Sequence, residues 1–209
     1  MIKFLDIYKQ DRFLHKSIIK KISKLFIKGD FIMGNEVQIF ENNFRKYCNA
    51  KYAISCGNGT DALTIALKSL DLPKNSEVIL PAMTYCSTAF AVLNANLKPI
   101  LVDTESLKST IDLRELKKKI TKKTKVILPV HLYGSVANLN GIKKIINNKN
   151  IYLIDDCAQA HGAYDNSLKT HNKNKIGSTS DISCFSLYPG KNLGAYGDCL
   201  LYTSPSPRD

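Results

Sequence analysis

The sequence predicts an α/β domain with a largely parallel sheet whose two faces are covered by helices. Short apolar runs of strand length occur at residues 77–80, 99–102, 125–130 and 151–154. Helix-like segments near residues 85–95, 112–120 and 138–147 separate these runs. Strands and helices that alternate in this way form parallel sheets with helices on both sides. Because ligands gather at the carboxyl ends of such strands, we expect the functional residues there.

The composition fits a folded domain and narrows the classes of partner. Hydrophobic residues make up 44% of the 209 residues, enough to fill a substantial core. The net charge is +12, and nearly all of the positive charge comes from lysines scattered through helix-like stretches. Because no basic and aromatic motif accompanies this charge, we expect no nucleic-acid partner, whereas small anionic ligands remain compatible with it. No signal-peptide core and no membrane-spanning apolar run is visible, so we expect no membrane partner.

The cysteines give no sign of a disulfide framework or a metal centre. They form no CxxC pair and have no metal-ligand spacing with histidines. We therefore expect small buried side chains in a reducing cytoplasm, and no metal. The six positions are Cys48, Cys56, Cys86, Cys157, Cys184 and Cys199.

The N-terminal third predicts two helices and a strand that leads into a glycine turn. An amphipathic helix is expected over about residues 10–28, ended by Gly29, and a second helix follows. A short buried strand at 52–56 then runs into the turn at 57–62 and a helix at 63–70. The apolar positions at helical spacing are Leu14, Ile18, Ile22 and Leu25 in the first helix and Val37, Phe40, Phe44 and Tyr47 in the second.

The glycine turn at residues 57–62 predicts an anion site. A strand, a glycine turn and a helix start leave backbone N–H groups exposed at the positive end of the helix dipole, where phosphate is the usual occupant. The turn also matches the dinucleotide pattern G-x-G-x-x-A, for which Glu77 would be the ribose acid. A third interpretation is a purely structural turn in which Thr60 or Asp61 caps the helix.

Two further features follow predicted strands. Tyr85 could lie flat against a planar ligand, and the alternative is an ordinary half-buried tyrosine. Asp155 and Asp156 end an apolar strand, where buried carboxylates need a cation, such as a protonated ring nitrogen or a metal. Helix capping and a magnesium site compete here, but no second acidic strand end supports the metal.

Residues 181–198 predict a strand that presents one lysine in a tight turn. Apolar and small or polar residues alternate before the Pro-Gly turn, and Lys191 follows it. Asn192, Gly194 and Gly197 would let the backbone pack closely around the amine. A partly desolvated lysine is what imine chemistry needs, although a surface lysine in a glycine loop is the alternative.

Taken together, these parts are those of a pyridoxal 5'-phosphate site. A phosphate cradle, a stacking aromatic ring, an acid after a strand and an imine-forming lysine are each required. The acid keeps the pyridine nitrogen protonated, so that the ring can accept electrons from the substrate.

The motifs also resemble a known family. From the N-terminus to about Asp198 the chain is similar to the DegT/StrS family of pyridoxal-phosphate-dependent sugar aminotransferases, a branch of fold-type I. The resemblance is carried by four stretches in order: GNGTDAL at 57–63, KVILPVHLYG at 125–134, DDCAQAHGA at 155–163 and CFSLYPGKNLGAYGD at 184–198.

The resemblance implies roles for individual residues. Lys191 matches the Schiff-base lysine and Asp156 the acid that pairs with the pyridine nitrogen, so these two are the expected catalytic residues. The expected cofactor-binding residues are these two together with Gly59 and Thr60 in the phosphate turn, Ser186 beside it, Tyr85 stacking on the ring, and Gln159 near the phenolic oxygen. His161 belongs to the motif without an assigned role.

The reaction implied by the resemblance is amino transfer, usually from glutamate, to a keto group of a nucleotide-activated sugar, in a homodimer. Some relatives are dehydratases with histidine in place of the lysine, and Lys191 argues against that branch. Two other classes stay open: a non-catalytic or regulatory relative that binds pyridoxal phosphate, and a nucleotide-binding oxidoreductase.

The sequence departs from the family in three places. Asn75-Ser76 stands where a Gly-Asp turn is usual, and residues 164–177 are longer than the usual turn. Residues 199–209, CLLYTSPSPRD, equal one reading frame of a common sequencing adapter, so we expect that they are foreign to the protein. Residues 1–198 would then hold most of the cofactor domain without the C-terminal domain, and alone they should be poorly stable and inactive.

Overall fold

The computed structural model describes residues 6–165, 167, 174–196 and 200–204. Its helices are α1 (Ile7–Asp11), α2 (His15–Lys28), α3 (Asn35–Cys48), α4 (Gly59–Lys68), α5 (Cys86–Asn94), α6 (Leu113–Lys119) and α7 (Leu139–Ile146), and a 3-10 turn covers Leu132–Gly134. Its strands are β1 (Tyr52–Cys56), β2 (Glu77–Pro81), β3 (Lys98–Val102), β4 (Thr124–Ile127), β5 (Tyr152–Asp156), β6 (Tyr164–Asp165), β7 (Asn174–Lys175), β8 (Ile182–Ser186) and β9 (Leu200–Ser204).

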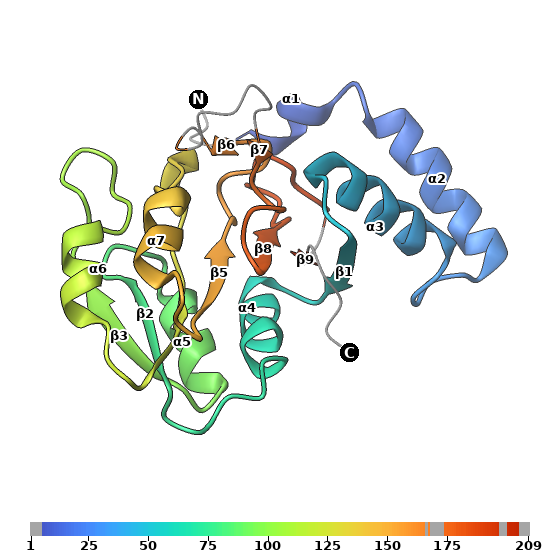
Figure 1. Ribbon diagram of the computed structural model, residues 1–209. Helices are drawn as coiled ribbons and strands as arrows, with labels where there is room; N and C mark the ends of the chain where they lie inside the picture. The colour runs from blue at the N-terminus through green and yellow to red at the C-terminus, as the bar shows by residue number, and fades with distance from the viewer. Residues whose placement is uncertain (1–5, 166, 168–173, 197–199, 205–209) are drawn as a thin grey trace.

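The main sheet is seven-stranded, in the order β1-β9-β8-β5-β4-β2-β3 (Figure 1). Strands β8, β5, β4, β2 and β3 pair in parallel, whereas β9 is antiparallel to both of its neighbours, β1 and β8. Since β1 and β8 are both antiparallel to β9, β1 runs in the same direction as the other parallel strands. The predicted α/β class with a mostly parallel sheet is therefore confirmed.

Successive residues of the central strands enter two different cores. In β2, Val78 and Leu80 belong to the cluster formed with α4 and α5, whereas Ile79 belongs to the cluster formed with α6 and α7. β4 divides in the same way, with Val126 in the first cluster and Ile127 in the second. Because side chains alternate across a strand, this division places helices on both faces of the sheet.

The strand and helix boundaries follow the sequence expectations closely, with three larger shifts. The helix expected at 63–70 is α4, which begins four residues earlier, within the glycine turn, and ends at Lys68. The run expected at 125–130 forms β4 only to Ile127, since Pro129 has no N–H to continue the ladder. The helix expected over 10–28 is divided: α1 ends at Asp11, the chain turns, and α2 begins at His15. Its predicted end is confirmed, because Gly29 caps it in a left-handed conformation (φ 68°).

Helix α2 carries an apolar stripe that the described residues cover only in part. None of its residues is fully buried: Ile18 and Leu25 are half-buried, and Ile22 is 45% exposed. In Figure 1, α2 lies beyond α3 and away from the sheet. By contrast α3 packs on the sheet through Phe44, whose ring meets that of Phe185 in β8 edge-on at 5.0 Å.

The cysteines are only partly as expected. Cys48, Cys157 and Cys184 are buried, and burial raises the pKa of each thiol. Cys86 begins α5 and is exposed, and Cys56 ends β1 and is half-buried. Both residues lie beside loops that open to solvent. Cys199 lies outside the described residues.

Residues 200–204, part of the stretch expected to be foreign, form β9 between β1 and β8. Backbone hydrogen bonds hold a strand in a sheet and tolerate many sequences, so this placement does not bear on the origin of the segment. The division of the chain at residue 198 stays a prediction. Residues 164–177 contribute the short β6–β7 ladder, and the part between its strands lies largely outside the described residues.

Replacing Leu116 by alanine should lower the free energy of unfolding by about 2–5 kcal/mol, because a fully buried side chain of α6 leaves a cavity. The same change at Leu107, which is 97% exposed, should alter it by less than about 0.5 kcal/mol. Urea denaturation of the two variants measures the difference. Equal effects would contradict the assigned core.

Candidate active site

A cavity of about 500 Å³ lies where the carboxyl ends of several parallel strands meet. Residues that end or follow β1, β2, β4, β5 and β8 line it. The structure brings all seven expected cofactor residues to this cavity: Gly59, Thr60, Tyr85, Asp156, Gln159, Ser186 and Lys191. Their individual roles stay predictions.

The α4 end of the cavity is shaped by a helix cap that the sequence analysis missed. The Asn58 side chain accepts a hydrogen bond from the Asp61 backbone N–H at 3.0 Å and donates one to the Asp61 carboxylate at 2.7 Å. Asn58, rather than Thr60 or Asp61, is therefore the cap. The N–H groups of Gly59 and Thr60 belong to the first turn, which has no intrahelical partners, so this end can accept an anion.

Asp156 ends β5 and is held by two hydrogen bonds. Its Oδ1 accepts from the Ala158 backbone N–H at 3.0 Å, and its Oδ2 accepts from the Thr88 hydroxyl at 3.0 Å. Burial raises the pKa of Asp156, while these two hydrogen bonds and the charge of Lys191 lower it. No ion pair found among the described residues includes Asp156. A cationic group in the cavity would therefore stabilise its ionised form.

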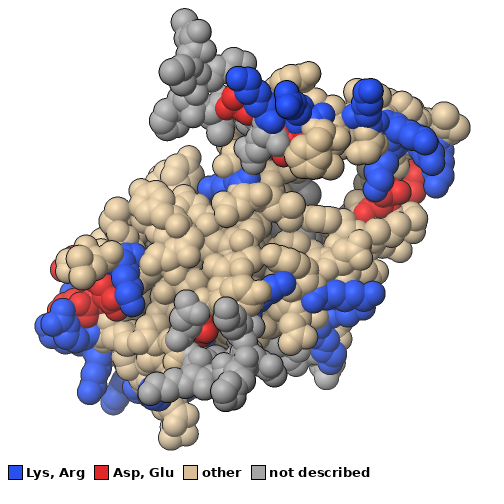
Figure 2. All heavy atoms as spheres, turned by 90° about the horizontal axis from the view of Figure 1, so that it is seen from above, with Lys and Arg blue, Asp and Glu red and all other residues tan. Residues whose placement is uncertain are grey.

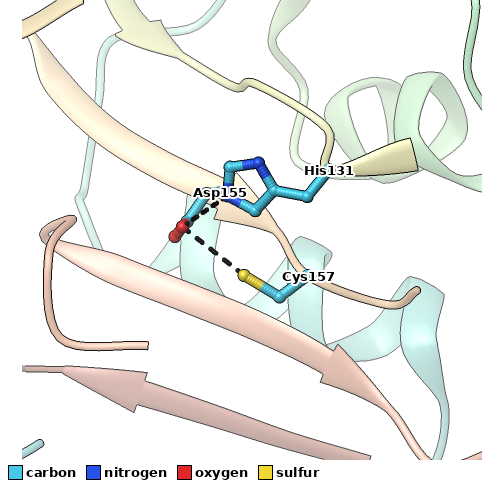
Figure 3. Close-up of side chains that lie close together, drawn as sticks. All are labelled: His131, Asp155 and Cys157. Atoms are coloured by element: carbon cyan, nitrogen blue, oxygen red, sulfur yellow. Dashed lines mark hydrogen bonds and ion pairs between the residues drawn. The ribbon is translucent and has the colours of Figure 1, made fainter. Parts of the chain in front are cut away.

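Asp155, the preceding residue, has a different environment (Figure 3). Its Oδ2 lies 3.0 Å from His131 Nε2 and accepts from the Cys157 thiol at 3.4 Å. The Ala137 backbone N–H donates to His131 Nδ1 at 3.1 Å, which leaves the proton of the neutral ring on Nε2. His131 was missed as a site residue, although it lies in the motif at 125–134.

The His131, Asp155 and Cys157 side chains could geometrically surround an ion, since their ligand atoms lie within 4.8 Å of one another. However, both ring nitrogens of His131 already take part in hydrogen bonds. Burial, and then the charge of Asp155, raise the pKa of Cys157 well above its ordinary value, so its thiol stays protonated. Since metals bind the thiolate, this cluster fits a buried hydrogen-bonded triad better than a metal site.

Lys191 lies in a closed turn after β8. Its backbone N–H donates to Tyr188 at 2.8 Å, and the Ala195 N–H donates to Leu187 at 2.8 Å. A Cβ on Gly194 would come within 2.4 Å of the Pro189 carbonyl oxygen, so only glycine fits there. The expected close packing is confirmed at Gly194, whereas Asn192 is exposed and Gly197 lies outside the described residues.

Two further polar side chains at the cavity are oriented by backbone groups. Gln159 Oε1 accepts from the Tyr133 N–H at 2.7 Å, which leaves its NH₂ group available to the cavity. Tyr133 adopts the left-handed conformation (φ 55°) to make this contact. Ser186 Oγ accepts from the Tyr188 N–H at 3.4 Å.

Tyr85 stands at the mouth of the cavity and is 70% exposed. It is therefore not the half-buried tyrosine of the alternative interpretation. A ring in this position can stack on a planar ligand.

His161 does not line the cavity with the other motif residues. Its ring packs against Phe185, with centroids 5.5 Å apart, and neither ring nitrogen makes a well-formed hydrogen bond with a described residue. Burial lowers the pKa of His161 from 6.5 to about 4. The ring is therefore neutral and contributes to packing.

Glu77 cannot serve as the ribose acid of a dinucleotide site. It begins β2, at the end of the sheet opposite the cavity. Its buried carboxylate accepts from the hydroxyls of Thr121 at 2.5 Å and Thr124 at 3.4 Å. The dinucleotide interpretation thus loses the acid it required.

On the face of the molecule shown in Figure 2, the charge is dispersed. Basic side chains lie in several separate groups, some beside acidic ones, with uncharged surface between them. Such a distribution does not resemble the continuous basic stripe of a nucleic-acid interface. Among the described residues, no helix combines the length and hydropathy needed to cross a bilayer.

Comparison with known sequences agrees with the family resemblance of the motifs. The sequence matches the DegT/DnrJ/EryC1/StrS aminotransferase family over residues 13–207. The dTDP-3-amino-3,6-dideoxy-alpha-D-galactopyranose transaminase of Aneurinibacillus thermoaerophilus is 40% identical over 186 residues, covering 89% of this chain and 50% of the relative. A pleiotropic regulatory protein of Geobacillus stearothermophilus is 36% identical over 197 residues, covering 94% of this chain and 51% of the relative. The chain thus spans about half the length of these curated relatives.

Solved structures agree with this match. S. venezuelae DesV superposes with a TM-score of 0.92 at 32% identity, covering 99% of this chain and 54% of that chain. NtdA from Bacillus subtilis, with bound cofactor pmp, superposes with a TM-score of 0.88 at 31% identity, covering 99% of this chain and 45% of that chain. The fold expected from the resemblance is confirmed.

His161 should titrate with a midpoint near pH 4 in an NMR titration of its ring protons, because burial holds its pKa at about 4. Its folded-state pKa lies below the unfolded value of 6.5, so the unfolded chain binds more protons between these pH values. Stability should therefore fall as the pH drops from 6.5 to 4, and fall less in His161→Phe. A midpoint near the unfolded value would contradict the assigned burial.

Proposed function

The chain belongs to the DegT/DnrJ/EryC1/StrS aminotransferase family, and from this premise we propose that the full-length protein is a pyridoxal-phosphate-dependent aminotransferase. It would move an amino group, with glutamate as the donor, to a keto group of a nucleotide-activated sugar. The observation that carries the proposal is that Asp156 and Lys191 line the same cavity. Asp156 is a buried carboxylate that forms no ion pair among the described residues, and Lys191 supplies an amine to the same space.

The residues present fit the cofactor. Asp156 lacks a cationic partner among the described residues, and a protonated pyridine nitrogen would supply one. The start of α4, with Gly59 and Thr60, offers N–H donors for a phosphate, and Ser186 adds a hydroxyl. Tyr85 would stack on the ring, and the free NH₂ of Gln159 would donate to its phenolic oxygen.

When bound, pyridoxal phosphate supplies an electron sink for the carbanion formed at the substrate carbon. The residues of the chain would do the rest. The Lys191 amine would hold the cofactor covalently and, once displaced by the donor amine, would take and return the proton at its Nζ. Asp156 would keep its negative charge beside the pyridine nitrogen, and the walls of the cavity would limit the access of water.

Nucleotide-sugar chemistry is supported by the relatives. The Aneurinibacillus thermoaerophilus relative is named as a transaminase of a dTDP-linked amino sugar. The presence of Lys191 favours amino transfer over dehydration, for which the sequence analysis expects histidine at this position. The name of the Geobacillus stearothermophilus relative keeps a regulatory function as the second candidate.

We also propose that the protein works as a homodimer in a reducing cytoplasm. The partly uncovered apolar stripe of α2 supports association. Cys48, Cys86, Cys157 and Cys184 are free thiols, which is compatible with a reducing compartment.

Lys191→Ala in the full-length protein should abolish the visible absorbance of the lysine-linked cofactor and slow amino transfer by at least about a hundredfold, because the covalent anchor and the proton carrier are both lost. The spectrum is recorded with pyridoxal phosphate, before and after addition of glutamate. The control is Lys98→Ala, an exposed lysine at the start of β3, which should behave as wild type.

Three outcomes separate the hypotheses. A wild-type band that glutamate converts supports the aminotransferase. A band that no amino donor changes favours the regulatory candidate. If wild type and Lys191→Ala show the same spectrum, the proposed cofactor site is wrong.

A further inference from the structure

Two threonine hydroxyls form a chain that ends on the Asp156 carboxylate. Thr84 Oγ1 lies 2.7 Å from Thr88 Oγ1, and Thr88 Oγ1 lies 3.0 Å from Asp156 Oδ2. Both threonines line the cavity, and Thr88 is fully buried in the first turn of α5. The sequence analysis did not assign a role to either residue.

The direction of this chain follows from the number of protons. An ionised carboxylate can only accept hydrogen bonds, so the Thr88 hydroxyl donates its one hydrogen bond to Asp156. Thr88 Oγ1 must then accept the hydrogen bond that the Thr84 hydroxyl donates. A protonated Asp156 would itself donate a hydrogen bond to Thr88 Oγ1 and would compete with Thr84 for that acceptor. The hydrogen-bond chain from Thr84 through Thr88 therefore favours the ionised form of Asp156.

The Thr88 hydroxyl donates its hydrogen bond outside its own helix, which is uncommon for a threonine in a helix. Threonine hydroxyls in helices commonly donate to the carbonyl three or four residues earlier. Thr64 in α4 does so, with its hydroxyl 2.7 Å from the Thr60 carbonyl oxygen. Thr88 instead reaches out of its helix to β5, which is 68 residues away in the sequence.

Resting on the proposed function, we infer that Thr88 is a positioning residue that orients the Asp156 carboxylate and keeps it ionised toward the pyridine nitrogen of the cofactor. The Ala158 N–H holds one carboxylate oxygen and Thr88 the other, which fixes the plane of the group. Each oxygen keeps a further lone pair for a ligand in the cavity.

The other groups near Asp156 that can carry a positive charge are His131, in the segment after β4, and Lys191, in the loop after β8. The neighbouring thiols Cys157 and Cys184 stay protonated, since burial raises their pKa values well above the ordinary range. None of these groups changes when Thr88 is replaced. A shift in the titration of cofactor binding would therefore report on the hydroxyl.

The test measures the affinity of the full-length protein for pyridoxal phosphate between pH 5 and 9, for wild type, Thr88→Val and Thr88→Ser. Removing the hydroxyl takes one hydrogen bond from a buried carboxylate, which weakens binding by about tenfold to a hundredfold. The acid limit of binding should move to higher pH, because the Asp156 carboxylate then protonates more easily. Thr88→Ser should stay within about threefold of wild type, since it keeps the hydroxyl.

The matched control is Thr124→Val. Thr124 is also a buried threonine whose hydroxyl bonds a buried carboxylate, that of Glu77, but at the opposite end of the sheet. This variant should lose stability without moving the acid limit of cofactor binding. A second readout is the chemical shift of the pyridine nitrogen in ¹⁵N-labelled cofactor, which should move toward the unprotonated value only in Thr88→Val.

The outcomes are distinct. The inference is overturned if the acid limit of cofactor binding does not move in Thr88→Val, or if Thr88→Ser does not keep the wild-type limit. In both cases, cofactor binding by the wild type still supports the proposed function. Absence of a lysine-linked cofactor in wild type overturns both. Should Thr88→Val not fold, Thr84→Val carries the test: a smaller shift in the same direction supports the inference, and no shift overturns it.

Discussion

The burial of the Asp156 carboxylate is the constraint on which the site depends. A carboxylate at the end of a central strand is costly unless donors and positive charge surround it. Thr88 and the Ala158 N–H supply the donors, and the charge of Lys191 lowers the pKa that burial raises. What remains is a demand for a cation on the cavity side. The protonated ring nitrogen of the proposed cofactor would meet this demand.

The parallel sheet places the groups that meet this demand. The strands with which Asp156 shares the sheet end on the same edge, so the loops after β1, β2, β4 and β8 all reach one cavity. Each loop brings a different chemical part: N–H donors from α4, a hydroxyl and an aromatic ring near α5, and an amine after β8. The backbone of Asp156 itself is tied to β4, through Pro129 and His131. Rigid strands thereby fix groups that are far apart in the sequence.

Adjacent residues serve different ends because the strand alternates its side chains. Asp155 is enclosed with His131 and Cys157, whereas Asp156 faces the cavity. Asp155 therefore belongs to a buried hydrogen-bonded triad, whereas Asp156 is the carboxylate open to a ligand in the cavity. A similar division separates His161, which packs on Phe185, from Gln159, which is oriented by the Tyr133 backbone.

The sequence by itself determined the α/β class and most element boundaries, because hydrophobic periodicity is a local signal, and the resemblance of its motifs to a known family named the seven residues that meet in the cavity. It failed where partners are distant. The bond from Thr88 to Asp156 joins residues 68 apart, and that from His131 to Asp155 joins residues 24 apart, so no local pattern marks either. Motif patterns alone left both aspartates as candidates, and only the family resemblance singled out Asp156. The tertiary structure decided which of the two faces the cavity and placed Glu77 at the opposite end of the sheet, because it sets which end and which face of the sheet each side chain occupies.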